Sequence, residues 1–566
     1  METYQRLETQ LKHESDGPFS TELPAIVDVL VAGFGPVGAA IANLLGRYGL
    51  RVLVIDKDKD IFMSPRAIAL DNEALRILQS VGLKEGDFET IAIPYVRMVC
   101  PYMGEFGRVN TLGCIDGHPK LVTFYQPELE RALRTRLAAY RSVHTALGVT
   151  LTGFSQSADS VTATLELEGG RKASVTARYL IGVDGASSIV RKLIGEEFLG
   201  ETYGEDWLIV DAKNVPSPID HIEFICDHRR PTPHMVAPGG RERWEFMLHP
   251  GEGREEMESE ANIRKLLARW TTPEQITLER KAVYRFHARV AREFSKGRVF
   301  LAGDAAHITP PFVGQGLVAG LRDAVNLCWK LAWVIQGRAA ESILDSYNQE
   351  RRPHAEAMIS LAKFMGKMVM PRNAIAAVLI HGIMRLVRLI PPIRRQFDDQ
   401  GVKPKNEFYK GLFMKKSAGS KLVRGGVLPQ GWVRGADGSM LLSDDVFGTS
   451  LTLIGFGSDA AAALDERTHR AFTAAGGKIV QIAHRGQHLH LVPERCWEDL
   501  EGAFMPKSVP FGWAAIVRPD RTIINDGPVT EASRLVSESL ALLGAPLAPA
   551  TSSLGTAVSI SEGASI

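Results

Sequence analysis

The sequence predicts an α/β fold: a Rossmann-like parallel-sheet domain, interrupted by a mainly antiparallel β domain and followed by a further α/β domain. Three observations predict it. A glycine-rich turn joins an apolar strand to a helix near the N-terminus, short alternating runs fill the middle of the chain, and strands alternate with helices again from Val427 onward. Strand–helix alternation is typical of parallel sheets, whereas period-two runs are typical of half-buried antiparallel strands.

The first element is residues 27–58. An apolar strand turns through Gly-x-Gly-x-x-Gly into an Ala/Leu-rich helix that ends at about Tyr48, and a second strand, 52–55, leads to an acid. The three glycines suit a tight turn, a close approach of backbone to a pyrophosphate, and close helix–strand packing. The helix N-terminus then faces phosphates, and the acid can bind a ribose hydroxyl, in NAD or FAD alike. The candidate residues are Gly33, Gly35, Pro36, Gly38, Asp56 and Lys57.

The second element is an apolar strand within 177–195 that ends in Asp184 and Gly185. Two serines and Arg191 follow, at the start of a predicted helix. An acid in this place either serves a ligand site or hydrogen-bonds the first turn of the helix. The residues leave both interpretations open.

The third element, "LAGDAAHITPPFVGQGLVAG" (301–320), places Gly303 and Asp304 directly after a strand predicted over 299–302. Ligands bind at such strand ends in open α/β sheets. A ligand that reaches both this acid and the first glycine turn must be long. FAD fits, because Asp304 can accept hydrogen bonds from the hydroxyls of its ribityl chain.

The rest of this element leads into the N-terminus of a predicted helix. Pro310 and Pro311 stiffen the loop, and Gly314 and Gly316 bring backbone N–H groups close to a helix predicted over 317–335. A helix N-terminus favours negative charge. It therefore suits the anionic ring of a reduced flavin.

GxGxxG, then DG, then GD, in this order and spacing, resemble the class A flavoprotein monooxygenases, the aromatic hydroxylases that include phenol hydroxylase. Within this family, "RWEFMLHPGE" (243–252) and "SYNQERRPHA" (346–355) are similar to the 3-(3-hydroxyphenyl)propionate hydroxylases. The loop 309–313 departs from them, which leaves the substrate open. The resemblance implies tightly bound, non-covalent FAD, with Arg66, Gln126, Asp184, Gly303, Asp304, Gly316 and Leu317 among its contacts.

The resemblance also implies a reaction. NADH or NADPH docks transiently, and a phenol is hydroxylated ortho to its hydroxyl through a flavin C4a-hydroperoxide formed with O₂. The substrate is expected to be a small phenol similar to 3-(3-hydroxyphenyl)propionate. Two alternatives stay open: the same chemistry on a nitrocatechol, polyketide or prenylated phenol, and a non-catalytic escort protein with a flavoprotein fold.

Three residues are candidates for catalysis: His307, Pro310 and Arg243. His307 follows the GD motif and could act as a base, or could anchor the loop by a hydrogen bond. Arg243 shares a strand face with Glu245 and Met247. These side chains could line the substrate pocket, or Arg243 and Glu245 could pair with each other.

The expected domain boundaries follow from these elements. A lead-in covers 1–26, and a thioredoxin-like domain without a CxxC motif, structural or dimerising in role, covers 421–545. A helical linker and a tail complete the chain at 371–420 and 546–566. The FAD-binding domain is expected over 27–84, 116–199 and 296–370, and the substrate domain over 85–115 and 200–295.

Composition excludes several other functions. The formal net charge of +1 creates no strong electrostatic attraction for nucleic acid. Five scattered cysteines without ligand spacing predict neither a metal site nor a disulfide framework, and they suit a reducing cytoplasm. No signal peptide or membrane span is predicted. The expected partners are the phenol and O₂, with a homodimer possible.

Overall fold

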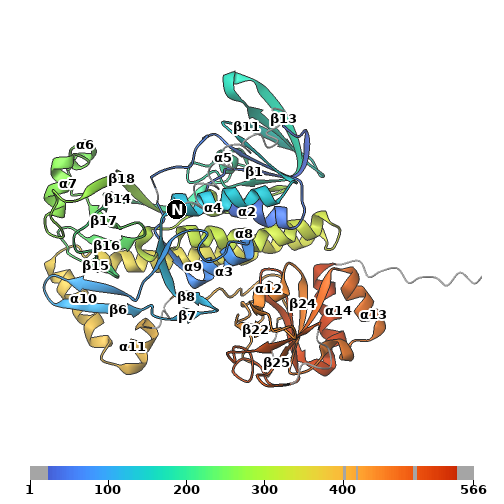
Figure 1. Ribbon diagram of the computed structural model, residues 1–566. Coiled ribbons are helices and arrows are strands. Elements are labelled where there is room, and N and C mark those ends of the chain that lie inside the picture. Colours follow the sequence, from blue (N-terminus) through green and yellow to red (C-terminus); the bar gives the residue numbers. More distant parts are fainter. Residues whose placement is uncertain (1–22, 65, 399–402, 416–418, 488–493, 545–566) are drawn as a thin grey trace, which may run out of the picture.

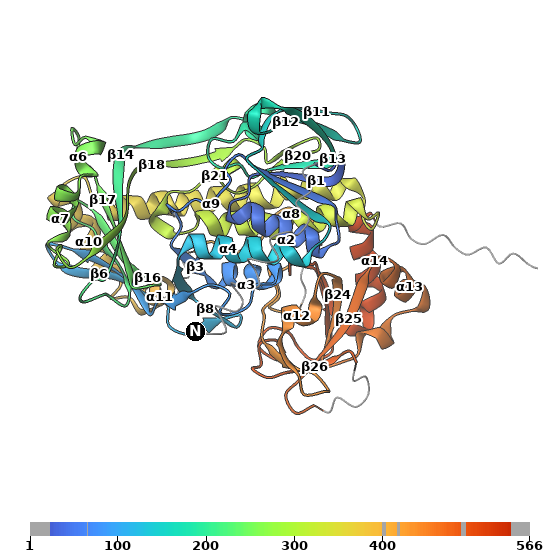
Figure 2. The ribbon, with the colours of Figure 1, turned by 45° about the horizontal axis from the view of Figure 1, so that its top comes forward.

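The computed structural model describes residues 23–64, 66–398, 403–415, 419–487 and 494–544 (Figure 1). A parallel-sheet domain lies between an antiparallel sheet and a C-terminal domain, and two long strands run from the first domain into the antiparallel sheet (Figure 2). The fold class predicted from the sequence is confirmed. The predicted lead-in lies mostly, and the predicted tail wholly, outside the described residues.

The first sheet contains the predicted Rossmann-like core. β1 pairs in parallel with β2 on one side and with β13 on the other, and β10 and β20 extend the parallel part. β1, β2 and β20 are largely buried because their side chains are almost all aliphatic. Their bounds are β1 Ile26–Ala32, β2 Val52–Asp56, β10 Val143–Leu147, β11 Thr150–Gln156, β12 Val161–Glu166, β13 Lys172–Gly182, β19 Ser295–Lys296 and β20 Val299–Leu301.

Two helices of this domain begin at the functional loops. α2 starts at Pro36 after the first glycine turn, and α8 starts at Gly316, one residue before the predicted helix. They pack closely because Gly320 has no side chain: a Cβ there would lie 2.7 Å from Cγ2 of Val37. The bounds are α2 Pro36–Arg47, α3 Asn72–Val81, α4 Gln126–Arg136, α5 Ile189–Leu193, α8 Gly316–Ile335 and α9 Asp345–Val369.

The second sheet has eight strands in the order β21-β18-β14-β17-β16-β15-β5-β6. It is antiparallel apart from the β15–β5 pair, as the alternating runs predicted. α10 (Ala374–Val387) and α11 (Pro391–Asp398) pack against β6. The other bounds are β5 Tyr95–Cys100, β6 Gly104–Asn110, β14 Phe198–Lys213, β15 Ile222–Ile225, β16 Thr232–Ala237, β17 Arg241–Met247, α6 Arg254–Met257, α7 Glu260–Leu267, β18 Thr277–Ala291 and β21 His307–Ile308.

Short pairings connect these parts. β3 (Ala69–Asp71) and β4 (Thr90–Ala92) flank β9 (Leu121–Phe124), while β7 (Cys114–Ile115) pairs with β8 (His118–Pro119). Within the described residues, no helix combines the length and apolarity that crossing a membrane requires.

The C-terminal domain has its own mixed sheet, in the order β23-β22-β26-β25-β24-β27-β28. β24, α13 and β25 form a parallel βαβ unit, and the antiparallel pair β27–β28 precedes α14. The bounds are β22 Trp432–Arg434, β23 Met440–Leu442, α12 Ser443–Phe447, β24 Leu451–Phe456, α13 Glu466–Ala474, β25 Gly477–Ala483, β26 Cys496–Asp499, β27 Trp513–Val517, β28 Ile523–Pro528 and α14 Ala532–Leu543.

Buried ion pairs attach this domain to the helices of the first. Arg518 donates to both carboxylate oxygens of Glu350 on α9, at 2.7 and 2.9 Å, and Lys330 on α8 donates to the same carboxylate at 2.8 Å. All three side chains are inaccessible to solvent. Burial alone would raise the pKa of Glu350, but the two cations outweigh it and hold that pKa far below its usual range.

Replacing Arg518 by leucine should destabilise the protein by about 3–5 kcal/mol, because the buried carboxylate of Glu350 loses its bidentate partner. Urea unfolding followed by tryptophan fluorescence measures the loss. Arg534→Leu is the control, since Arg534 pairs with Glu531 and Glu538 at the surface and should change stability by about 0–1 kcal/mol. Equal losses in the two variants would contradict the structural role of the buried pair.

Candidate active site

A cavity of about 1370 Å³ connects the first glycine turn to the second sheet. Its wall includes the starts of α2 and α8, the loop after β20, and side chains of β5, β6 and β14–β18. Among the predicted site residues it contains Gly33, Gly35, Pro36, Gly38, Asp56, Lys57, Arg66, Gln126, Asp184, Gly303, Asp304, Pro310, Gly316 and Leu317.

The three glycines of the first turn have different structural roles. Gly33 has φ +112°, and a Cβ there would lie 2.4 Å from the carbonyl oxygen of Val183. A Cβ on Gly38 would lie 2.1 Å from the Gly33 oxygen. Gly35 differs, because a Cβ there would meet no protein atom within 4 Å. Gly33 and Gly38 therefore allow the chain to pack, whereas Gly35 leaves room in the cavity.

Asp56 lies at the carboxyl end of β2, half-buried at the cavity wall. One carboxylate oxygen accepts from the backbone N–H of Phe34 at 2.6 Å, and the other accepts from that of Asp58 at 2.9 Å. The acid thus fixes the glycine turn and presents its remaining lone pairs to the cavity. Lys57, the next residue, is exposed at the rim.

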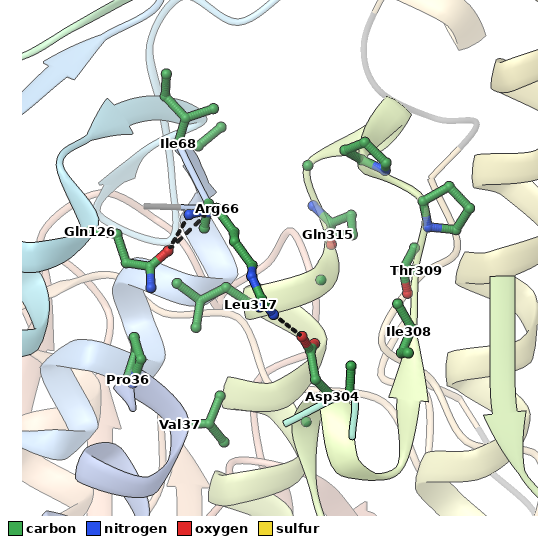
Figure 3. Close-up of a pocket in the computed structure, with 18 of the residues that line it drawn as sticks. Pro36, Val37, Arg66, Ile68, Gln126, Asp304, Ile308, Thr309, Gln315 and Leu317 are labelled. Atoms are coloured by element: carbon green, nitrogen blue, oxygen red, sulfur yellow. Dashed lines mark hydrogen bonds and ion pairs between the residues drawn. The ribbon is translucent and has the colours of Figure 1, made fainter. Parts of the chain in front are cut away.

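Arg66, Gln126 and Asp304 meet across the cavity (Figure 3). Gln126 opens α4, and its Oε1 accepts from the backbone N–H of Arg66 at 3.0 Å and of Ala67 at 2.9 Å. The guanidinium of Arg66 lies 3.8 Å from the carboxylate of Asp304. Burial raises the pKa of Asp304, while Arg66 and His307 oppose the increase. Three segments distant in sequence thereby present polar groups to one space.

The loop carrying Asp304 is held by a buried acid that the sequence analysis missed. Asp323 on α8 accepts from the backbone N–H of Gly303 at 3.0 Å, from Nε2 of His307 at 2.6 Å and from Nε of Arg351 at 2.9 Å. Burial would raise its pKa, but His307 and Arg351 hold the pKa below its usual value. A signal was present in the sequence, because Arg322 and Asp323 are adjacent charged residues in a mostly apolar helix.

A second polar network fixes the start of α8. Gln315 donates to Asp71 at 3.0 Å and accepts from Arg322 at 3.0 Å, and Lys403 donates to Asp71 at 2.6 Å. In the described part of the chain, the N-cap residues of α8 and α2, Gln315 and Gly35, form no side-chain cap. A Cβ on Gly316 would meet no protein atom within 4 Å. Both helices therefore open onto the cavity with free N–H groups, which favour bound negative charge.

His307 and Arg243, two of the three predicted catalytic residues, do not line the cavity. His307 is 1% exposed and bonded to Asp323, which agrees with the loop-anchoring alternative. Arg243 is 2% exposed and pairs with Asp211 at 2.6 and 2.9 Å, not with Glu245. Since neither side chain reaches the cavity, the structure contradicts direct contact with substrate. Both side chains instead hold buried acids in place, His307 at Asp323 and Arg243 at Asp211.

Pro310 and Asp184 do line the cavity. Asp184 accepts from Ser188 Oγ and from the backbone N–H groups of Ile189, at 2.6 Å, and Val190, at 3.2 Å. Its carboxylate therefore stabilises the first turn of α5, the structural alternative for this motif. The second sheet adds an apolar wall to the cavity, made by Ile209, Ile222, Phe224, Met235 and Phe286.

Comparison with known proteins identifies the family. Residues 26–362 match the model of the FAD binding domain family, and residues 425–542 match that of the HcaD C-terminal domain. The chain belongs to the class A FAD-binding monooxygenases. It is 36% identical to the 3-(3-hydroxy-phenyl)propionate/3-hydroxycinnamic acid hydroxylase of Escherichia coli O139:H28, over 81% of this chain and 83% of that one.

Solved structures agree on the fold. The flavin-dependent monooxygenase PieE, in complex with FAD and substrate, superposes with a TM-score of 0.75 at 20% identity, over 91% of this chain and 99% of that one. Aklavinone-11 hydroxylase, with FAD and aklavinone, gives 0.72 at 23% identity, over the same shares of the two chains. The protein is an FAD-dependent aromatic hydroxylase.

The residues present fit FAD. The open side of Gly35 and the uncapped start of α2 suit the pyrophosphate, and Asp56 suits the ribose of the adenosine end. Asp304 lines the same cavity, and its carboxylate suits the hydroxyls of a ribityl chain. The uncapped start of α8 suits the flavin ring. The cavity then continues to the apolar wall of the second sheet.

Gly35→Val should fold normally yet lose FAD, because its new side chain enters the cavity and meets no protein atom. Flavin absorbance after gel filtration, with far-UV circular dichroism, separates binding from folding. Gly204→Val is the control, since Gly204 also has open space around its Cα but lies away from the cavity. Full flavin occupancy in Gly35→Val would contradict a phosphate at this turn.

Asp304→Ala should raise the dissociation constant of FAD by about 10-fold or more, because charge-assisted hydrogen bonds are worth about 1.5–3 kcal/mol each. Flavin fluorescence during titration of the apoprotein measures the constant. Asp159→Ala, an exposed loop acid, should leave it unchanged. Equal constants for wild type and Asp304→Ala would show that this carboxylate does not hold the cofactor.

Proposed function

We propose that this chain hydroxylates a small phenol with an acidic side chain, such as 3-(3-hydroxyphenyl)propionate, ortho to its hydroxyl, with NADH or NADPH as the reductant and O₂ as the oxygen source. The observation that carries the proposal is the apolar wall of the second sheet, which faces the start of α8 across the cavity. An aromatic ring fits against such a wall. The similarity to the E. coli hydroxylase supports this substrate class.

Two cations support an acidic side chain on the substrate. Arg108 on β6 and Arg388, which follows α10, both line the cavity, and α10 packs on β6. Arg108 already donates to both carboxylate oxygens of Glu105, at 2.9 and 2.8 Å, so the contact is tested at Arg388. A guanidinium matches the two oxygens of a carboxylate. Such a contact would fix the side chain at this end of the cavity and orient the ring towards the start of α8.

When bound, FAD supplies the redox chemistry that side chains cannot. The chain's own residues orient the reactants and exclude water. Phe312, in the loop after Pro310, packs on Trp207 and Phe286 with ring centroids 5.8 and 5.9 Å apart. This aromatic cluster closes the cavity beside the loop. The uncapped start of α8 provides N–H groups where negative charge is expected to develop.

The test is a panel of phenols supplied with NADH or NADPH. Wild type should consume O₂ and convert 3-(3-hydroxyphenyl)propionate to a product one oxygen atom heavier, identified by mass spectrometry. Arg388→Met should raise the KM for this substrate by about 10-fold, the loss of a hydrogen bond to a charged group. It should leave the KM for uncharged 3-ethylphenol unchanged.

Arg372→Met provides the matched control, because Arg372 is exposed just before α10 and does not line the cavity. The proposed function fails if the FAD-loaded protein produces no hydroxylated product from any phenol on the panel. The proposed carboxylate contact fails separately, if Arg388→Met raises KM equally for charged and uncharged phenols.

A further inference from the structure

A buried carboxyl group faces the cavity from the middle of the second sheet. Glu245 on β17 is 7% exposed and lines the cavity. Among the lining residues that this sheet contributes within the described chain, it is the only acid. Its neighbour across the β14 pairing is Ile209, which is apolar. The acid thus stands alone on a surface that otherwise suits an aromatic ring.

The carboxyl group of Glu245 has no hydrogen-bond partner among the described residues, although ionic groups surround it. Arg243 lies two residues earlier on the same strand face, but donates to Asp211 at 2.6 and 2.9 Å. Arg280 on β18 reaches Asp211 at 3.4 Å and lies over the ring of Tyr284, 5.2 Å from its centroid. Two arginines therefore balance two acids, Asp211 and Glu245.

This arrangement keeps the acid available to a ligand. Burial raises the pKa of Glu245, Arg243 and Arg280 oppose the increase, and Asp211 adds to it, with a net rise. Buried polar groups in folded proteins almost always have a partner. The partner missing here must come from the cavity, and a phenol bound against this wall carries a hydroxyl that can donate.

We propose that Glu245 binds the phenolic hydroxyl of the substrate and accepts its proton. This inference rests on the proposed function. The O–H bond of the phenol breaks, its electron pair stays on the phenolic oxygen, and a new O–H bond forms on the carboxylate. The charge of −1 moves from the acid to the substrate, so Arg243 and Arg280 balance it before and after the transfer. The phenolate ring is richer in electrons, which favours attack on an electrophilic oxygen.

The test compares FAD-loaded wild type with Glu245→Gln across pH 7–10. The glutamine keeps the size and can still accept a hydrogen bond, but it cannot take up a proton. We expect kcat to fall by about 10²-fold or more near neutral pH, with KM little changed. We expect kcat to recover as the pH approaches about 10, where a phenol ionises without help.

Two further measurements separate proton uptake from a structural effect. Glu245→Asp keeps a proton acceptor and should retain the pH profile of wild type at a lower kcat. A more acidic nitrophenol, already ionised at neutral pH, should be hydroxylated by Glu245→Gln nearly as fast as by wild type. Glu201→Gln is the matched control, because Glu201 lies on β14 of the same sheet, is exposed, and pairs with Lys363.

The inference is overturned if Glu245→Gln has an unchanged kcat, or if its loss is the same at every pH and for both phenols. It is also overturned if Tyr284→Phe, and not Glu245→Gln, shows the alkaline recovery, since Tyr284 also lines the cavity. These outcomes bear on Glu245 only when the wild-type protein hydroxylates at least one phenol. A wild type that hydroxylates no phenol would instead refute the proposed function.

Discussion

The carboxylate of Asp323 is the interaction on which the rest of the active site depends. It is fully buried on α8 and binds three groups from different segments: the backbone of the Gly303 loop, His307 and Arg351. An unpaired charge in that position would be very unfavourable, so all three partners must be in place together. The loop that presents Asp304 to the cavity is therefore fixed by the same acid that joins α8 to α9.

The second constraint is that two helix N-termini must open onto one cavity. α2 and α8 pack together only because Gly320 leaves room for Val37. Neither N-cap residue forms a side-chain cap within the described chain, so a bound anion can satisfy the N–H groups of both first turns. The long strands β14 and β18 run from the first domain into the second sheet (Figure 2), and residues of that sheet line the same cavity. The cavity thus combines a polar end with an apolar wall.

The sequence predicted the parts of this arrangement that are local. A glycine turn between a strand and a helix has a fixed geometry, so Gly33, Gly35 and Asp56 could be placed from spacing alone. Asp323 and Glu245 could not, because their partners lie on other segments and only the fold brings them together. For His307 and Arg243, type and position suggested contact with substrate. The side-chain directions, which the sequence does not determine, instead place His307 in a buried hydrogen bond with Asp323 and Arg243 in a buried ion pair with Asp211.

The C-terminal domain acts on the site through α9. Glu350 accepts from Arg518 of that domain, whereas Arg351, the next residue, donates to Asp323 beside the cofactor loop. A second buried pair, Arg76 with Asp444 at 2.7 Å, ties the domain to α3. α3 begins at Asp71–Asn72, where Asp71 holds Gln315 at the start of α8. The C-terminal domain has no redox motif. It can still contribute to catalysis, because it holds α9 and α3, the helices that fix the Asp304 loop and the start of α8.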